Sequence, residues 1–191
     1  MTRQSPPLVA GDNLRQGSPN NETFEESLPR WVAGTDNAIS ATGVAHATPI
    51  PLQAGEVINY ITFVTGGTAA GTPTAGYIAL YSSASTPALL AQSADFGSTA
   101  RAANTKYKIQ LASAVTITSA GLYWVSISFT ASTVPTLRGA TMGNAAVAAS
   151  LVGSQAVGAQ SHGSAVGAVA PATITSGTAV ATPVYYILTT N

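Results

Sequence analysis

Short stretches of alternating hydrophobic and polar side chains fill much of the chain from about residue 39 onward. In residues 106–111, tyrosine, isoleucine and leucine alternate with lysine and glutamine, so that one face is apolar and the other is polar. Successive side chains of a β-strand point to opposite faces, and this period of two residues therefore predicts a half-buried strand. A period of two also predicts strands over residues 56–64, 115–117, 122–129 and 184–188, and over residues 76–82, where Tyr77, Ala79 and Tyr81 alternate with Ile78 and Leu80.

Turn-forming residues separate the predicted strands. Glycine, proline, serine and threonine are concentrated in residues 66–67, 71–73, 82–87, 97–98 and 119–121, and these residue types favour tight turns. Many short strands, short connections and no strong helical periodicity predict an all-β fold. Within that class we expect an antiparallel β-sandwich, jelly-roll-like in its arrangement.

Residues 139–182 show no comparable period, because small side chains fill them. We expect long loops and edge strands here that lie against neighbouring subunits. For residues 145–152, a helical turn and an extended segment are both open.

The N-terminal segment differs from the rest. Residues 1–27 contain Pro6-Pro7, Gly11-Asp12 and Gly17-Ser18-Pro19 without apolar periodicity between them, a pattern typical of irregular chain. We expect an extended N-terminal anchoring arm over residues 1–27, which orders only on a partner, and a β-sandwich body over residues 28–191. A short helical turn is possible near the acidic residues that end the arm.

Charge is distributed very unevenly between arm and body. The chain has seven basic and seven acidic residues, of which eight lie in the first 36 positions and none follows Arg138. Charged residues make up 7% of the chain, whereas soluble domains average about a quarter. The body must therefore expose serine and threonine or bury uncharged faces against copies of itself. We expect a homotrimer, with a dimer as the alternative.

Composition also excludes several kinds of site. The net charge is zero and no basic patch is present, so nucleic-acid binding is not expected. The absence of cysteine excludes disulfides and thiolate metal sites. No stretch of about 20 predominantly apolar residues is present, so no membrane span is expected. We also expect no cofactor.

Candidate catalytic residues are few. Beyond residue 36 the acids are Glu56 and Asp95, and both lie in segments typical of turns or side-chain caps. His46 is expected on a strand at a surface or interface, and His162 in a Gly/Ser loop. A Ser–His–Asp triad is formally possible, but no nucleophile elbow accompanies it. We therefore expect a protein that is not an enzyme.

Aromatic side chains suggest one further kind of site. Rings can stack on sugars in carbohydrate-binding sandwiches, although residues at strand spacing more commonly pack in a core. The candidates are Trp31, Tyr60, Tyr77, Tyr81, Tyr123, Trp124, Tyr185 and Tyr186.

The junction between arm and body provides the candidate partner-anchoring residues, which are Phe24, Leu28, Arg30 and Trp31. Three of these are large apolar groups beside a charged segment, and an aromatic anchor typically contributes about 2 kcal/mol or more to binding. Arg30 and the acidic residues of the segment can steer docking by charge pairing. The alternative is that Trp31 packs beneath the sandwich.

Seven segments in order carry a resemblance to a known family. They are Leu28-Pro29-Arg30-Trp31 and residues 65–74, 77–81, 90–95, 103–105, 121–125 and 134–139. This order resembles a β-sandwich domain of structural proteins in tailed bacteriophages that infect actinobacteria, which occurs in minor tail proteins and in head-decoration or head-fibre proteins. The resemblance covers residues 28–191. Arg101 departs from it, since an aromatic residue is expected there, and the arm has no counterpart.

The resemblance implies a non-enzymatic virion structural protein on the virion surface, assembled in the host bacterial cytoplasm. A capsid decoration protein attached through its N-terminal arm is the first expectation, with itself and the major capsid protein or another virion protein as partners. The alternative is a tail-tip or baseplate minor tail protein that binds host-surface glycans. A secreted adhesin module is a third possibility, without a recognisable signal sequence to support it.

Overall fold

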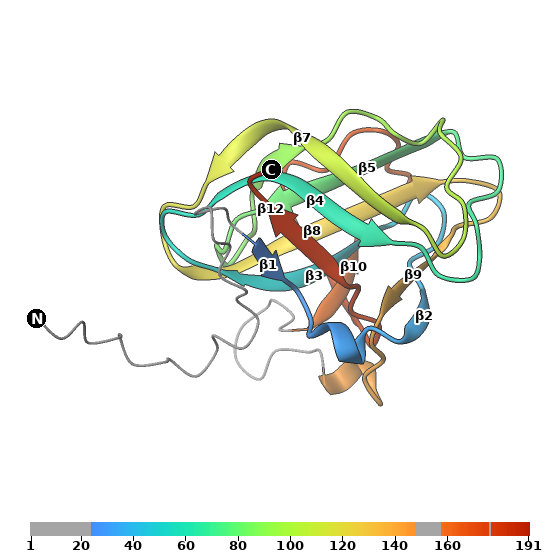
Figure 1. Ribbon diagram of the computed structural model, residues 1–191, viewed down its shortest axis with the longest axis horizontal. Coiled ribbons are helices and arrows are strands. Elements are labelled where there is room, and N and C mark those ends of the chain that lie inside the picture. Colours follow the sequence, from blue (N-terminus) through green and yellow to red (C-terminus); the bar gives the residue numbers. More distant parts are fainter. Residues whose placement is uncertain (1–23, 148–157, 176) are drawn as a thin grey trace, which may run out of the picture.

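The computed structural model describes residues 24–147, 158–175 and 177–191, and in this part of the chain the all-β prediction is confirmed. Two antiparallel sheets are stacked face to face (Figure 1). In order across the sheet, the four-stranded one contains β1 (Phe24–Glu26), β12 (Tyr186–Thr189), β4 (Val57–Val64) and β7 (Lys106–Thr116). The six-stranded one contains β11 (Thr178–Val180), β10 (Ala159–His162), β3 (Ala45–Leu52), β8 (Gly121–Thr130), β5 (Ala75–Tyr81) and β6 (Leu89–Gln92).

Smaller elements complete the fold. The strands β2 (Thr35–Ala38) and β9 (Thr136–Gly139) form a two-stranded sheet. Two 3-10 turns are present in the described residues, η2 (Arg30–Val32) and η3 (Ala145–Val147). Of the two alternatives left open for residues 145–152, η3 is the helical turn, over residues 145–147; residues 148–152 lie outside the described part.

Three predicted strands agree closely with β4, β5 and β8, and the last predicted strand is shorter as β12. The separate strands expected over residues 106–111 and 115–117 are instead one long strand, β7. Its pairing with β4 is irregular between Ile58 and Tyr60, so β7 carries extra residues opposite β4. A bulge of this kind interrupts alternation along one strand without ending the strand, which explains the error.

The main core lies between the two larger sheets. Phe63, Phe96 and Phe129 form its aromatic centre, with Phe96 and Phe129 edge to face at 5.5 Å between ring centroids. Arg101, where an aromatic residue was expected, stacks its guanidinium on Phe96 at 5.0 Å and on Tyr107 at 4.7 Å. A planar guanidinium can stack on rings as an aromatic side chain does, so Arg101 adds flat packing surface beside the core.

A second apolar cluster lies on the opposite face of the six-stranded sheet. Residues 163–175, which we name the strap, cross this face and place Ala170 and Ile174 against it. The strap is tied down along its length: Val166 N–H donates to the Gly43 carbonyl at 2.8 Å, and Ile174 N–H donates to the Pro87 carbonyl at 2.9 Å. The sheet is therefore covered on both faces. Of the loops and edge strands expected over residues 139–182, the structure shows the edge strand β11 and its neighbour β10.

The predicted boundary between arm and body is wrong by several residues. β1 pairs with β12 in register, with Phe24 opposite Thr189 and Glu26 opposite Ile187. Residues 24–27 thus belong to the body, and the segment Phe24–Glu26 is extended, not a helical turn. The rest of the expected arm, residues 1–23, lies outside the described residues.

A close backbone contact at Gly97 yields a test of the packing. A Cβ atom there would lie 1.8 Å from the carbonyl carbon of Ala75, so Gly97→Ala forces backbone movement. We expect a loss of about 1–3 kcal/mol in the free energy of unfolding, measured by chemical denaturation. Gly143→Ala is the matched control, because a Cβ atom there meets nothing within 4 Å. Equal stability of the two variants would contradict this packing.

Candidate functional site

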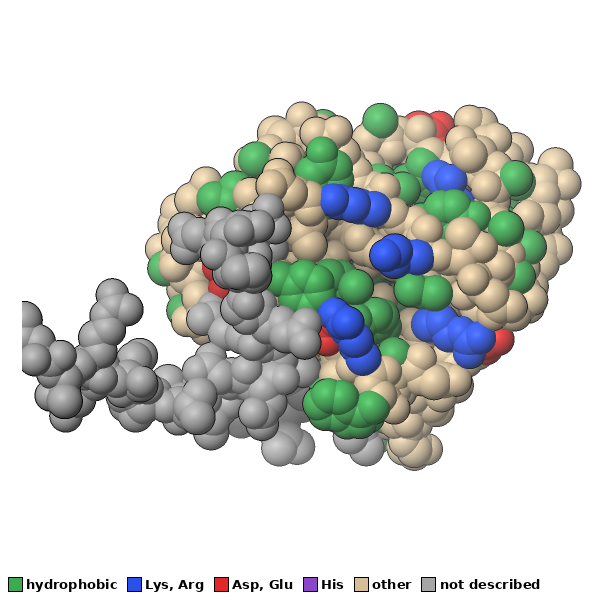
Figure 2. Space-filling model, in the orientation of Figure 1, with side chains coloured by type: hydrophobic (Ala, Val, Ile, Leu, Met, Phe, Trp, Pro, Cys, Tyr) green, Lys and Arg blue, Asp and Glu red, His purple; other side chains and the backbone are tan. Residues whose placement is uncertain are grey.

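The most exposed large hydrophobic side chain of the described residues is Trp31, at 79% of its accessible surface. It lies on η2, directly after β1, and Val32 beside it is 41% exposed. Figure 2 shows hydrophobic side chains at the surface where Figure 1 draws this turn. The alternative that Trp31 packs beneath the sandwich is therefore wrong. We name residues 30–32 the Trp31 turn.

The chain on the N-terminal side of the Trp31 turn is braced by a charged cluster. Arg30 Nε forms an ion pair with Glu26, and the Tyr185 hydroxyl donates to the same carboxylate oxygen at 2.7 Å. The Arg30 guanidinium also lies over the Phe24 ring, 5.3 Å from its centroid. The hydrogen bond with Glu26 raises the pKa of Arg30.

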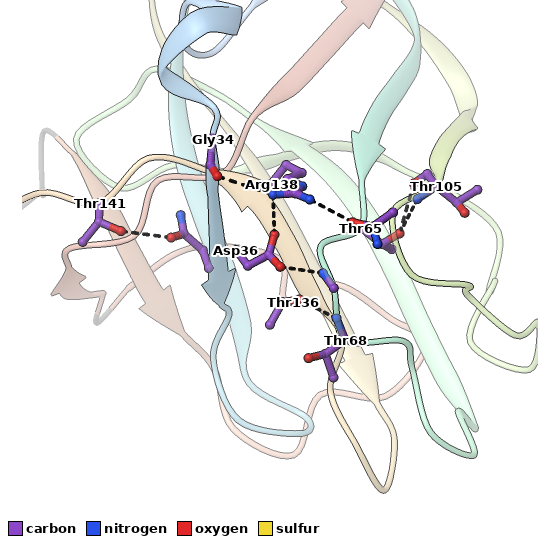
Figure 3. A network of polar contacts seen from close by, with 11 residues as sticks. Gly34, Asp36, Thr65, Thr68, Thr105, Thr136, Arg138 and Thr141 are labelled. Carbon is purple, nitrogen blue, oxygen red and sulfur yellow. Dashed lines mark hydrogen bonds and ion pairs between the residues drawn. The ribbon is translucent and has the colours of Figure 1, made fainter.

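The chain on the C-terminal side of the turn is braced by a second polar network (Figure 3). Arg138 on β9 forms an ion pair with Asp36 on β2 at 2.7 Å. Arg138 also donates to Asn104 Oδ1 at 2.8 Å, and Gly67 N–H donates to Asp36 Oδ2 at 2.7 Å. These contacts tie β2, which follows the Trp31 turn in sequence, to β9 and to the loops that contain Gly67 and Asn104.

The paired glycines of residues 66–67 are explained by this network. A Cβ atom at Gly66 would lie 2.6 Å from Asp36 Oδ1 and 2.5 Å from Thr136 Oγ1. Only glycine lets the loop approach the carboxylate so closely. Thr65 fixes the start of the same loop, since its hydroxyl accepts from Thr105 N–H at 2.9 Å.

The four predicted anchoring residues lie together at this end of the body, with different exposures. Phe24 and Leu28 are half-buried, whereas Arg30 and Trp31 are exposed. The expectation that the neighbouring acids face a partner is wrong for Glu25 and Glu26, which are buried in the body. Glu26 instead holds Arg30, and this contact could not be read from the sequence because Tyr185, 159 residues away, completes it.

Basic side chains share the face that carries the Trp31 turn. Figure 2 shows Lys and Arg side chains gathered over the four-stranded sheet and the two-stranded sheet. Lys106 and Lys108 on β7 are exposed, and Lys108 Nζ lies 4.2 Å from the centroid of the Tyr60 ring. Arg30 and Arg138 lie on the same face, each paired with a carboxylate, so the lysines give this face, which we name the basic face, its net positive charge.

His46 is placed differently from the expectation. It does lie on a strand, β3, but it is buried at 1% exposure and is no surface residue. Its Nε2 is 2.8 Å from the Thr182 carbonyl, which only accepts, so Nε2 carries the proton. Burial lowers the pKa of His46 to about 4, outweighing that hydrogen bond.

An open pocket of about 350 Å³ lies against His46. Its lining includes Ile39, Ser40, Val44, Val180 and Thr182. None of the described residues that line it is Lys, Arg, Asp or Glu, and His46 Nδ1 lies 3.4 Å from Ser40 Oγ.

His162 is also buried, at 4% exposure, and ends β10 instead of lying in a loop. Its Nε2 lies 2.8 Å from Ser126 Oγ, an arrangement that superficially matches a nucleophile and its base. A carboxylate orienting the ring would raise the pKa of the imidazole. Burial, followed by the nearby charge of His46, instead lowers the pKa of His162 to about 4. The pair is a buried structural contact beneath the strap.

The two candidate acids have the capping roles that their positions suggested. Asp95 Oδ1 accepts from Gly76 N–H at 3.0 Å and from Gly97 N–H at 2.8 Å. Glu56 Oε2 accepts from Gln53 N–H at 2.8 Å. In the described part of the chain, no three His, Asp or Glu side chains are grouped so as to hold a metal ion. Nor is any helix there long and apolar enough to cross a membrane.

Most of the candidate sugar-stacking rings are unavailable for stacking. Tyr77, Tyr81, Tyr123, Trp124, Tyr185 and Tyr186 are all buried. Of the remaining two, Tyr60 is half-buried beneath Lys108, which leaves Trp31 as the accessible ring.

No family model matches the chain, and no curated protein matches it in sequence. The candidate site therefore rests on its geometry.

The buried histidines predict a pH-dependent stability. Their folded pKa of about 4 lies below the ordinary value of 6.5, so between these values the unfolded chain binds more protons. Stability is complete above pH 6.5 and falls as the pH drops toward 4, by up to about 3 kcal/mol per histidine. Denaturation midpoints measured across this range check the slope.

His162→Gln removes one of the two histidine contributions, so the free energy of unfolding should fall less steeply as the pH drops from 6.5 to 4. The dependence of that free energy on denaturant concentration should stay unchanged. A wild-type slope that matches the variant's over this pH range would mean that His162 is not held neutral in the folded protein.

Proposed function

We propose that the protein is a non-enzymatic structural protein of a bacteriophage virion, and specifically a capsid decoration protein. In this proposal it attaches through its N-terminal segment and the Trp31 turn. The observation that carries it is the exposure of Trp31, at 79%, on a turn that is braced on both sides. The family resemblance of residues 28–191 supplies the virion context.

The energetic argument rests on preorganisation. A buried tryptophan at an interface commonly contributes 2 kcal/mol or more to binding, and the gain is larger when the side chain needs little ordering. The ion pairs Arg30–Glu26 and Arg138–Asp36 fix the backbone before and after Trp31. A partner with an apolar pocket can therefore receive Trp31 at little cost in conformational entropy.

The basic face supports a partner surface that is acidic around such a pocket. Lys106 and Lys108 are exposed there, and complementary charges steer association more than they add affinity. An acidic surface of a major capsid protein, or of another virion protein, would satisfy this requirement. The homotrimer expected from the low charge of the body belongs to the same proposal.

The tail-tip alternative is less well supported by the geometry. A glycan platform needs accessible rings, and six of the eight candidate aromatics are buried. Trp31 remains able to stack on a sugar, so the two functions separate experimentally. Binding of the full-length protein to a glycan array, lost in Trp31→Ala, would favour the tail-tip function. Labelling of heads in intact particles with an antibody to this chain would favour decoration.

Replacing Trp31 tests the attachment directly. We expect Trp31→Ala to retain wild-type stability, since the side chain is largely exposed, and to bind about 30-fold more weakly to particles grown without the protein. Particle binding is measured by co-sedimentation. Leu90→Ala is the control, because Leu90 is an exposed hydrophobic on the other sheet. Unchanged binding of Trp31→Ala would contradict the role of the turn.

Truncation separates the N-terminal segment from the turn. The cut belongs after residue 22, since β1 and Glu26 are needed to brace Arg30. We expect the chain lacking residues 1–22 to fold with wild-type circular dichroism and to lose full occupancy on particles. A truncated protein that still decorates particles fully would place attachment in the body alone.

A further inference from the structure

Charge is segregated between the two sides of the sandwich. None of the six strands in the β11–β10–β3–β8–β5–β6 sheet contains Lys, Arg, Asp or Glu. The strap that covers this sheet is likewise uncharged, as is all sequence after Arg138. By contrast, Lys and Arg side chains gather on the face shown in Figure 2. We name the outer face of the six-stranded sheet, with the strap, the uncharged side.

Exposed hydrophobic side chains occur on the same side. Apart from the Trp31 turn, the exposed large hydrophobics of the described residues are Leu90 at 40%, Leu122 at 39% and Val169 at 71%. Val169 is on the strap, and Leu122, the second residue of β8, lies beside Pro51 of β3. Side chains alternate along a strand and the next residue, Tyr123, faces the main core, so Leu122 belongs to the uncharged side with Val169. Leu90 lies on the edge strand β6, where the pairing with β5 is irregular.

The backbone of the strap is already used within the chain. Gln92 donates to the Ala168 carbonyl at 3.2 Å and accepts from Ala170 N–H at 2.8 Å. Leu89 N–H donates to the Ala172 carbonyl at 2.9 Å. A partner on this side would therefore contact side chains of the strap, because these backbone groups of the strap already form hydrogen bonds within the chain.

We propose that the uncharged side is the surface through which copies of this chain associate. Monomer surfaces normally carry charges on about a quarter to a third of their residues, and the cores of homo-oligomer interfaces are depleted of charge. A charged partner would find no complement here. A second copy presents an equally uncharged surface, and symmetric assembly reuses the same residues in every subunit.

This inference does not depend on the virion assignment. It divides the molecule into a self-association side and a basic face with the Trp31 turn, which stays free for another partner. Failure of attachment to particles would leave it intact, whereas failure of self-association would remove the homotrimer from the proposed function and leave attachment through the Trp31 turn to be judged separately.

Sedimentation of the full-length protein at micromolar concentration tests the proposal. We expect the wild type to be oligomeric, and Val169→Glu and Leu122→Glu each to raise the dissociation constant about a hundredfold, because each buries a charge in the interface. Val32→Glu is the matched control: at 41% exposure it resembles Leu122 at 39%, but it lies on the Trp31 turn. Its oligomer should be unchanged.

A second measurement covers the case of a variant that does not fold. The chain has no cysteine, so Val169→Cys introduces a single thiol. Its reaction with a maleimide should be slow at concentrations that favour the oligomer and fast on dilution, whereas Val32→Cys should react at one rate throughout. A monomeric wild type, a dissociating Val32→Glu, or a thiol at position 169 that is equally reactive at all concentrations would overturn the proposal.

Discussion

The structure depends on the burial of apolar side chains between two antiparallel sheets. Phe63, Phe96 and Phe129 occupy the centre of that layer, and strands from both sheets contribute to it. Burial of a large aromatic side chain stabilises a fold by a few kcal/mol, which matters here because few charges are available for other interactions. Arg101 joins this layer by stacking, so even a cation contributes through its flat surface.

Charge has a local role in this fold. The ion pairs Arg30–Glu26 and Arg138–Asp36 lie before and after the Trp31 turn. Elsewhere, carboxylates such as Asp95 cap backbone N–H groups. The few charged residues of the body thus fix the geometry of one exposed segment and of tight loops, while hydroxyl and backbone hydrogen bonds hold the remaining connections.

The two sides of the sandwich suggest a division of roles. The basic face presents Trp31 with exposed lysines, a composition typical of attachment to an acidic partner. The uncharged side has a strap tied down by its own backbone and a few exposed hydrophobics, a composition typical of contact between identical subunits. This division would allow an oligomer to direct all its attachment surfaces outward from a shared interface.

The sequence by itself determined the fold class and most of the long strands, because a period of two bounded by turn residues marks a strand even where, as in β5, both faces are buried. It also singled out Trp31, which stands beside a charged segment and is exposed in the structure; its anchoring role stays a prediction. Only the tertiary structure decided that β1 joins the sheet, that Glu26 holds Arg30, and that both histidines are buried. These outcomes depend on partners more than 100 residues away, such as Tyr185 for Glu26 and Thr182 for His46, and local pattern contains no information about such contacts.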